Sequence, residues 1–103
     1  MPVLHLLNHT PRGSESFARC LESMAEGDGL LLIEDAVYAA LSGTPSAGEL
    51  RAVAAARNRY FVLKPDLETR ALSVRRLAEG FECVDFSGFV DLVANYDASI
   101  SWG

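Results

Sequence analysis

Two cysteines are the residues of this sequence with the most direct covalent chemistry. Cys20 follows Arg19 in a segment whose apolar residues repeat at helical spacing, and Cys83 stands between Glu82 and Val84 in a short apolar run. A neighbouring guanidinium favours the nucleophilic thiolate when the sulfur reaches the surface. A cysteine on the inward stripe of a helix is otherwise a small buried apolar residue. Cys20 is therefore predicted as either a core residue or a reactive thiol, and Cys83 as a structural residue.

The histidines and glycines show no pattern of a metal or cofactor site. His5 and His9 lie four residues apart across the end of a predicted strand, where that spacing does not bring side chains together, and no Cys-x-x-Cys pair accompanies them. Gly27, Asp28 and Gly29 precede a predicted strand, whereas a dinucleotide-binding loop follows one. No cofactor or metal is expected. His5 is interpreted as a hydrogen-bonded histidine of the core or of an interface.

Three aspartates, Asp35, Asp66 and Asp85, each follow a predicted strand and open a predicted helix. A carboxylate at this position accepts hydrogen bonds from the first free N–H groups of the helix and meets the positive end of its dipole. Capping is the predicted role of each. Because strand-to-helix turns of a parallel sheet converge on one edge, the alternative is a ligand-binding cleft lined by the three acids.

Five short apolar segments predict the strands that position these residues. The second of them has consecutive aliphatic residues that suit a strand covered on both faces. The segments are 3–7, 30–33, 60–63, 81–84 and 98–102.

Helical patterns separate the strands. The first is capped by Ser14, has the inward stripe Phe17, Cys20, Leu21 and Met24, and stops at Gly27. The others are 36–41, 49–56, one opening at Pro65 and Asp66, and one opening at Asp85 with Phe86, Phe89, Val90 and Val93 inward. Strands that alternate with helices predict a three-layer α/β fold with a mostly parallel sheet of about five strands. The length of 103 residues suits a single domain, 1–103.

Composition limits the function classes. Nine basic and 14 acidic residues give a net charge of -5, which repels a phosphate backbone, so direct nucleic-acid binding is not expected. Hydrophobic residues make up 50% of this small chain, a surplus that predicts a partner surface. No segment has the pattern of a signal peptide or a membrane span. We expect a cytoplasmic chain with two reduced cysteines and no membrane contact.

Several strings of the sequence, read in order, resemble one family. They are Leu4-His5, Thr10-Pro11, the segment 32–40, the segment 65–70, Val84-Asp85-Phe86, the segment 89–92 and the penultimate Trp102. They are similar to the DsrH/TusB family, the smallest of three related subunits in the DsrEFH and TusBCD sulfur-relay complexes.

The resemblance implies a DsrE-like domain in a heterohexamer that holds two copies of each subunit and carries sulfur as a cysteine persulfide. It implies two sister subunits as partners, one DsrE/TusD-like and one DsrF/TusC-like, together with upstream and downstream sulfur-carrier proteins. The sulfur serves 2-thiouridine formation at the tRNA wobble position in one branch and dissimilatory sulfur oxidation in the other. The larger sister subunit has its sulfur-accepting cysteine near the loop that matches 63–66, where this chain has none.

Two roles follow from the resemblance. The first is a non-catalytic subunit that assembles the complex. The second is a persulfide carrier at Cys20, which matches a first-helix position where some family members have a cysteine. Tyr38, Phe89 and Trp102 are predicted as aromatic anchors of subunit interfaces. The alternative is a stand-alone ligand-binding α/β module without sulfur transfer.

Overall fold

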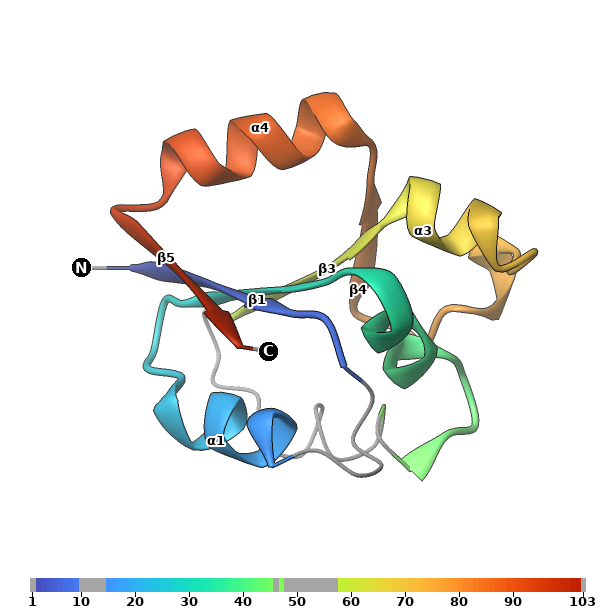
Figure 1. The fold of residues 1–103 in the computed structure, drawn as a ribbon, viewed down its shortest axis with the longest axis horizontal. Helices are drawn as coiled ribbons and strands as arrows, with labels where there is room; N and C mark the ends of the chain where they lie inside the picture. Colours follow the sequence, from blue (N-terminus) through green and yellow to red (C-terminus); the bar gives the residue numbers. More distant parts are fainter. Residues whose placement is uncertain (1, 10–14, 46, 48–57, 103) are drawn as a thin grey trace.

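A computed structural model describes residues 2–9, 15–45, 47 and 58–102. Within these residues five strands form one sheet in the order β4-β3-β2-β1-β5, and each neighbouring pair is parallel (Figure 1). The predicted α/β class with a mostly parallel sheet is confirmed, and each strand boundary lies within one residue of its predicted position. The strands are β1 (Val3–Leu7), β2 (Gly29–Leu32), β3 (Arg59–Leu63), β4 (Phe81–Val84) and β5 (Ala98–Trp102).

One face of the sheet packs against the helices of the first half of the chain and against one residue of a later helix. The helix α1 (Ser16–Ser23) and the 3-10 helix η1 (Glu34–Ala40) lie on this face, and Leu67 of α3 (Lys64–Thr69) joins the same core. All four residues of the central strand β2 are buried, which explains its continuous aliphatic run. The core of this face is Leu7, Phe17, Cys20, Leu30, Leu32, Ala36, Val37, Ala39, Ala40, Tyr60, Val62 and Leu67.

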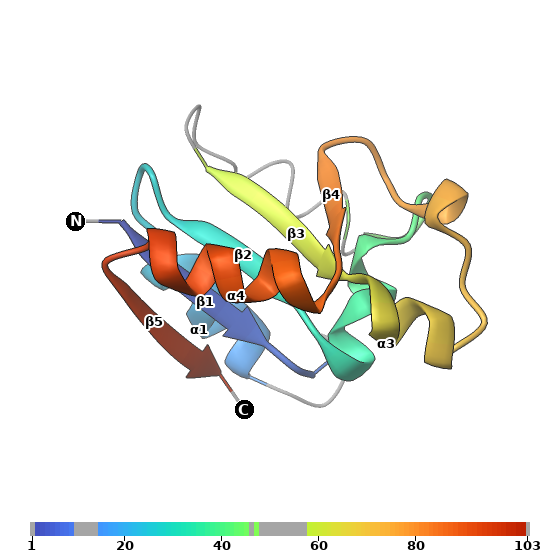
Figure 2. The same ribbon diagram turned by 90° about the horizontal axis from the view of Figure 1, so that it is seen from above.

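The opposite face is covered by α4 (Phe86–Asn95), which runs across the strands (Figure 2). Its core consists of Leu4, Leu31 and Phe61, with partly buried side chains packed around them. The short 3-10 helix η2 (Val74–Arg76) lies between α3 and β4. The result is the predicted three-layer arrangement. No helix in the described residues is long and apolar enough to cross a membrane.

The helices of the first face differ from their predicted bounds. The predicted cap Ser14 lies outside the described residues, as does the predicted helix 49–56. Phe17 and Cys20 of α1 are buried against the sheet as predicted, but α1 ends at Ser23 and not at the glycine four residues later. The predicted helix 36–41 is a 3-10 helix that begins at Glu34.

The predicted inward face of α4 is wrong for three residues. Phe86, Val90 and Val93 are 61%, 65% and 42% exposed. The correct part of that prediction is Phe89, which packs on the sheet together with Leu92 and Tyr96. Both sets have helical spacing, so the period alone does not identify the buried one. The set that contains Tyr96 is favoured because its ring fits over Gly29, which has no side chain.

We predict that Gly29→Ala destabilises the fold. A Cβ at Gly29 would lie 2.7 Å from Cζ of Tyr96 and 3.2 Å from Cδ1 of Leu4, so the ring must shift. We expect the free energy of unfolding, measured in urea, to fall by about 1–3 kcal/mol. The Tyr96 hydroxyl is the atom nearest to that Cβ, so removing it relieves part of the clash. Gly29→Ala should therefore cost less stability when it is introduced into Tyr96→Phe than when it is introduced into wild type. Unchanged stability of Gly29→Ala would contradict the close approach.

Candidate functional site

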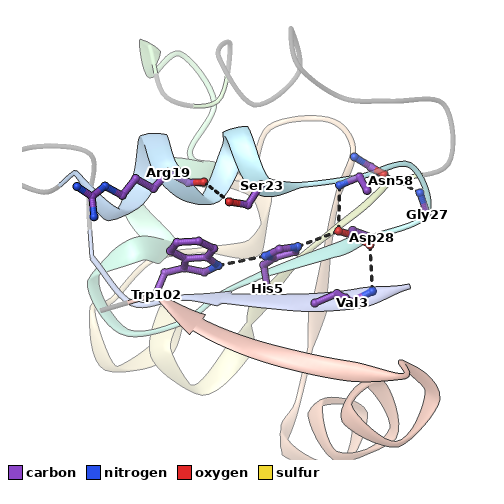
Figure 3. Close-up of polar contacts among 9 residues, drawn as sticks. Val3, His5, Arg19, Ser23, Gly27, Asp28, Asn58 and Trp102 are labelled. Atoms are coloured by element: carbon purple, nitrogen blue, oxygen red, sulfur yellow. Dashed lines mark hydrogen bonds and ion pairs between the residues drawn. The ribbon is translucent and has the colours of Figure 1, made fainter. Parts of the chain in front are cut away.

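A buried carboxylate and a buried imidazole form the centre of the polar interior. Asp28 lies just before β2 and His5 lies in the middle of β1, and they are 3% and 2% exposed. Oδ2 of Asp28 is 2.9 Å from Nε2 of His5 (Figure 3). The same oxygen accepts the Ala25 N–H at 3.0 Å. Oδ1 of Asp28 accepts the Val3 N–H at 3.0 Å. The carboxylate therefore joins the start of β1, the middle of β1 and the turn after α1.

These contacts determine the charge of Asp28. Burial by itself raises the pKa of this carboxyl. The hydrogen bonds from Ala25, His5 and Val3 outweigh burial and hold the pKa of Asp28 below its usual value. Asp28 is consequently a carboxylate at neutral pH.

The third member of this arrangement is Trp102, at the end of β5. Its Nε1 donates to Nδ1 of His5 at 3.1 Å, and the two rings are stacked with centroids 6.2 Å apart (Figure 3). An indole N–H only donates, so Nδ1 accepts, and Nε2 carries the ring proton and donates a hydrogen bond to Oδ2 of Asp28. Both imidazole nitrogens are thus occupied, which confirms the interpretation of His5 as a hydrogen-bonded core residue. We call these three residues the Asp28–His5–Trp102 chain.

No group of three or more His, Cys, Asp or Glu side chains among residues 2–9, 15–45, 47 and 58–102 is placed to hold a metal ion.

Arg70 brings together two of the three predicted acids at the carboxyl end of the sheet. Its Nε and Nη2 donate to Oδ1 of Asp35 at 3.1 and 2.9 Å, and its Nη1 donates to the backbone oxygen of Asp66 at 3.1 Å. Oδ2 of Asp66 accepts the Glu34 N–H at 2.7 Å. The predicted caps are therefore wrong for Asp35, which pairs with Arg70, and for Asp66, which binds the first residue of η1 and not its own helix.

Asp85 has the predicted capping role. Its Oδ1 accepts the Gly88 N–H at 2.8 Å at the start of α4. The carboxylates of all three predicted acids thus have protein partners, and the structure joins two of them through Arg70 and not all three in one cluster.

The two cysteines have different environments, and both are free thiols. Cys20 is fully buried, and burial raises the pKa of its thiol to about 12. Arg19 pairs with Glu15 at 3.1 Å on the outer side of α1. Burial also raises the pKa of the half-buried Cys83, an effect that the charge of Lys64 partly offsets. In this arrangement both thiols are protonated at neutral pH.

The predicted interface aromatics divide into two groups. Tyr38 of η1 is 40% exposed. Phe89 and Trp102 are partly buried against the core of their own chain. The sequence interpretation missed the outer stripe of α4, which we define as Phe86, Val90 and Val93. The signal for it was present, because α4 has two apolar stripes and a single sheet face buries one.

We predict that Asp28→Asn costs about 2–4 kcal/mol of the free energy of unfolding near pH 7, because an amide donor then faces backbone N–H groups in a buried site. The pKa of Asp28 is lower in the folded state than in the unfolded chain, where an aspartate has a pKa of about 3.9. The stabilisation by the carboxylate is complete above that value and is lost as the pH falls through the folded pKa.

The difference between wild type and Asp28→Asn should therefore shrink below about pH 4 in urea denaturation. Asp91→Asn, at an exposed position of α4, is the matched control and should change stability little at any pH. A difference that stays constant down to about pH 3 would contradict the assignment of a stabilising carboxylate to Asp28.

Comparison with known proteins places the chain among relatives of similar length. The family model described as DsrH like protein matches residues 9–99. Protein TusB of Pectobacterium parmentieri is 31% identical over 100 residues, 97% of this chain and 100% of the relative. Protein TusB of Escherichia coli O81 (strain ED1a) is 32% identical with the same coverage.

Solved structures share the fold at lower identity. The YchN protein from E. coli superposes with a TM-score of 0.76 at 20% identity and covers 97% of both chains. Protein MTH1491 from Methanobacterium thermoautotrophicum has a TM-score of 0.71 at 14% identity and covers 97% of this chain and 96% of its own. These two likenesses concern the fold alone. Because the family model spans most of the sequence and the relatives match over nearly their full length, the chain belongs to the DsrH/TusB family.

Proposed function

We propose that this chain is an assembly subunit of a sulfur-relay complex, in which sister subunits carry sulfur as a cysteine persulfide. Its membership of the DsrH/TusB family supports the relay. In the proposed complex the chain acts as a single domain beside DsrE/TusD-like and DsrF/TusC-like subunits in a heterohexamer. Upstream and downstream carrier proteins supply and remove the sulfur.

The observation that carries this proposal is the outer stripe of α4. Phe86 and Val90 have more than half of their surface exposed, and Val93 lies on the same side of the helix. Apolar burial contributes about 25 cal/mol per Å² removed from water, and aromatic residues are enriched in the buried centres of interfaces. The stripe is thus suited to pack against another subunit. Exposed Tyr38 on η1 offers a second anchor.

The named relatives support one destination for the sulfur. Because they are TusB proteins, we assign the chain to the branch that leads to 2-thiouridine at the tRNA wobble position, and sulfur oxidation of the DsrEFH type is the second candidate. The net charge of -5 disfavours contact between this chain and the RNA, so a downstream protein binds the tRNA. The proposed place of action is the cytoplasm, where thiols stay reduced.

Cys20 as a persulfide carrier is the competing proposal. A carrier thiolate must attack a sulfane sulfur along an open path. The buried Cys20 thiol, with its pKa raised to about 12, has neither charge nor access in this chain. These two properties favour the assembly role.

The outer stripe gives a test of assembly. Val90→Asp puts a charge at the centre of the stripe, and Asn95→Asp adds the same charge at an exposed position of α4 outside it. We expect Val90→Asp to reduce co-purification with the co-expressed sister subunits at least about tenfold, because burying an unpaired charge costs more than the roughly 1.4 kcal/mol that a tenfold change requires. Asn95→Asp should co-purify with the sister subunits about as well as wild type does. Equal recovery of both variants, with both folded, would contradict the interface at α4.

Incubation with a persulfide donor followed by mass spectrometry tests the role of Cys20. We expect no added sulfur on Cys20, either in the isolated chain or in the assembled complex. Cys20→Ser should lower the free energy of unfolding by about 1–3 kcal/mol, because a hydroxyl enters an apolar core, and Cys20→Ala separates that polarity from the loss of the thiol. A one-sulfur adduct that persists in Cys83→Ser and disappears in Cys20→Ala would establish the carrier role instead.

A further inference from the structure

We infer that the attachment of Trp102 depends on the protonation of His5, so that acid releases the end of β5 while the rest of the sheet stays folded. This inference does not depend on the proposed function. It rests on the hydrogen-bond chemistry of the Asp28–His5–Trp102 chain and on the edge position of β5.

The first step is the state of His5 at neutral pH. Nε2 of His5 faces the carboxylate of Asp28 at 2.9 Å, and a carboxylate only accepts. Nδ1 faces the indole N–H of Trp102 at 3.1 Å, and an indole N–H only donates. A neutral ring with its proton on Nε2 satisfies both partners. The opposite tautomer would pair two donors at one nitrogen and two acceptors at the other.

The second step is the result of adding a proton. The proton can enter only at Nδ1, because Nε2 already carries one. The new N–H then points at the N–H of Trp102, and this hydrogen bond must break. The bond to Asp28 strengthens, since its donor is then a cation that faces the carboxylate anion. His5 is therefore expected to stay with Asp28 and to lose Trp102.

The third step concerns the charges around the imidazole of His5. Its neighbours in register are Leu30 on β2 and Ile100 on β5, and both are apolar. On α1, Arg19 is turned outward to Glu15 and the Cys20 thiol is protonated. Asp28 supplies the charge in direct contact with the ring, and the indole N–H of Trp102 is its other polar contact.

The last step is the position of Trp102. β5 is an edge strand that pairs with β1 on one side, and its residues before Trp102 are exposed. Trp102 itself packs against the core and pairs in register with Leu7. Loss of the indole bond removes the side-chain hydrogen bond that ties the last residue of this strand to β1. The bonds from Val3 and Ala25 to Asp28 do not involve the new proton and remain.

Fluorescence of the intact chain tests the inference, because Trp102 is its one tryptophan. Lowering the pH from about 8 to about 5, the range in which histidines commonly titrate, should shift the emission to longer wavelength and reduce its intensity. Far-UV circular dichroism should stay constant over the same range, which distinguishes local release from unfolding. Emission that does not change over this range would overturn the inference.

The matched variant is His5→Gln. A glutamine can offer an oxygen to Trp102 and an N–H to Asp28, but it takes up no proton near neutral pH. The inference expects a Trp102 emission at about pH 8 close to that of wild type and no titration down to about pH 5. His9→Asn, which removes the other histidine, should keep the wild-type titration. A titration that survives in His5→Gln, or that disappears in His9→Asn, would overturn the inference.

Nitrogen NMR of wild type and His9→Asn provides a measurement that does not need the glutamine variant to fold. The His5 ring should show a protonated Nε2 and an unprotonated Nδ1 near neutral pH, and both nitrogens should be protonated when the Trp102 emission has changed. A ring with its proton on Nδ1 near neutral pH would overturn the assignment.

Discussion

The burial of the Asp28 carboxylate is the constraint on which the arrangement of the other segments depends. A buried charge is costly unless hydrogen bonds and opposite charge compensate it, so its partners must come together for the chain to fold. These partners are the Val3 and Ala25 N–H groups and the His5 ring. The turn before β2 therefore lies beside the start of β1, and through His5 the same contacts reach the end of β5, at the opposite end of the sequence.

The two faces of the sheet are covered unequally, and this difference connects the fold with its proposed role. The first face buries α1 and η1. Two contacts join η1 to α3: Arg70, at the end of α3, pairs with Asp35, and Asp66 of α3 accepts the Glu34 N–H. The second face has α4, whose inner side covers Leu31 and Phe61 while its outer stripe remains apolar. An ordinary amphipathic helix would turn a polar side to solvent here. A helix with two apolar sides instead has one side available for another subunit.

The fold could be predicted from the sequence, but the polar contacts could not. Strands buried on both faces give continuous apolar runs, so the local sequence predicts β2 and β3. The pairing of Asp28 with His5 spans 23 residues, and that of Arg70 with Asp35 spans 35. No local pattern marks such pairs, because they exist only once the strand order brings the segments together. The sequence places Asp28 between two glycines before a predicted strand, and nothing in that local pattern predicts its partners.

The amphipathic pattern of α1 also limits the chemistry of Cys20. The pattern predicted an inward stripe that includes Phe17 and Cys20, and both are buried. Exposing a buried phenylalanine costs about 1.5–3 kcal/mol, and moving α1 far enough to expose Cys20 would disturb Phe17 as well. A sulfur donor could therefore reach a thiol in this position only if part of the core were disrupted. If a sister subunit supplies the reactive cysteine, Cys20 can stay buried in an intact core. This chain would then contribute to the complex through the outer stripe of α4.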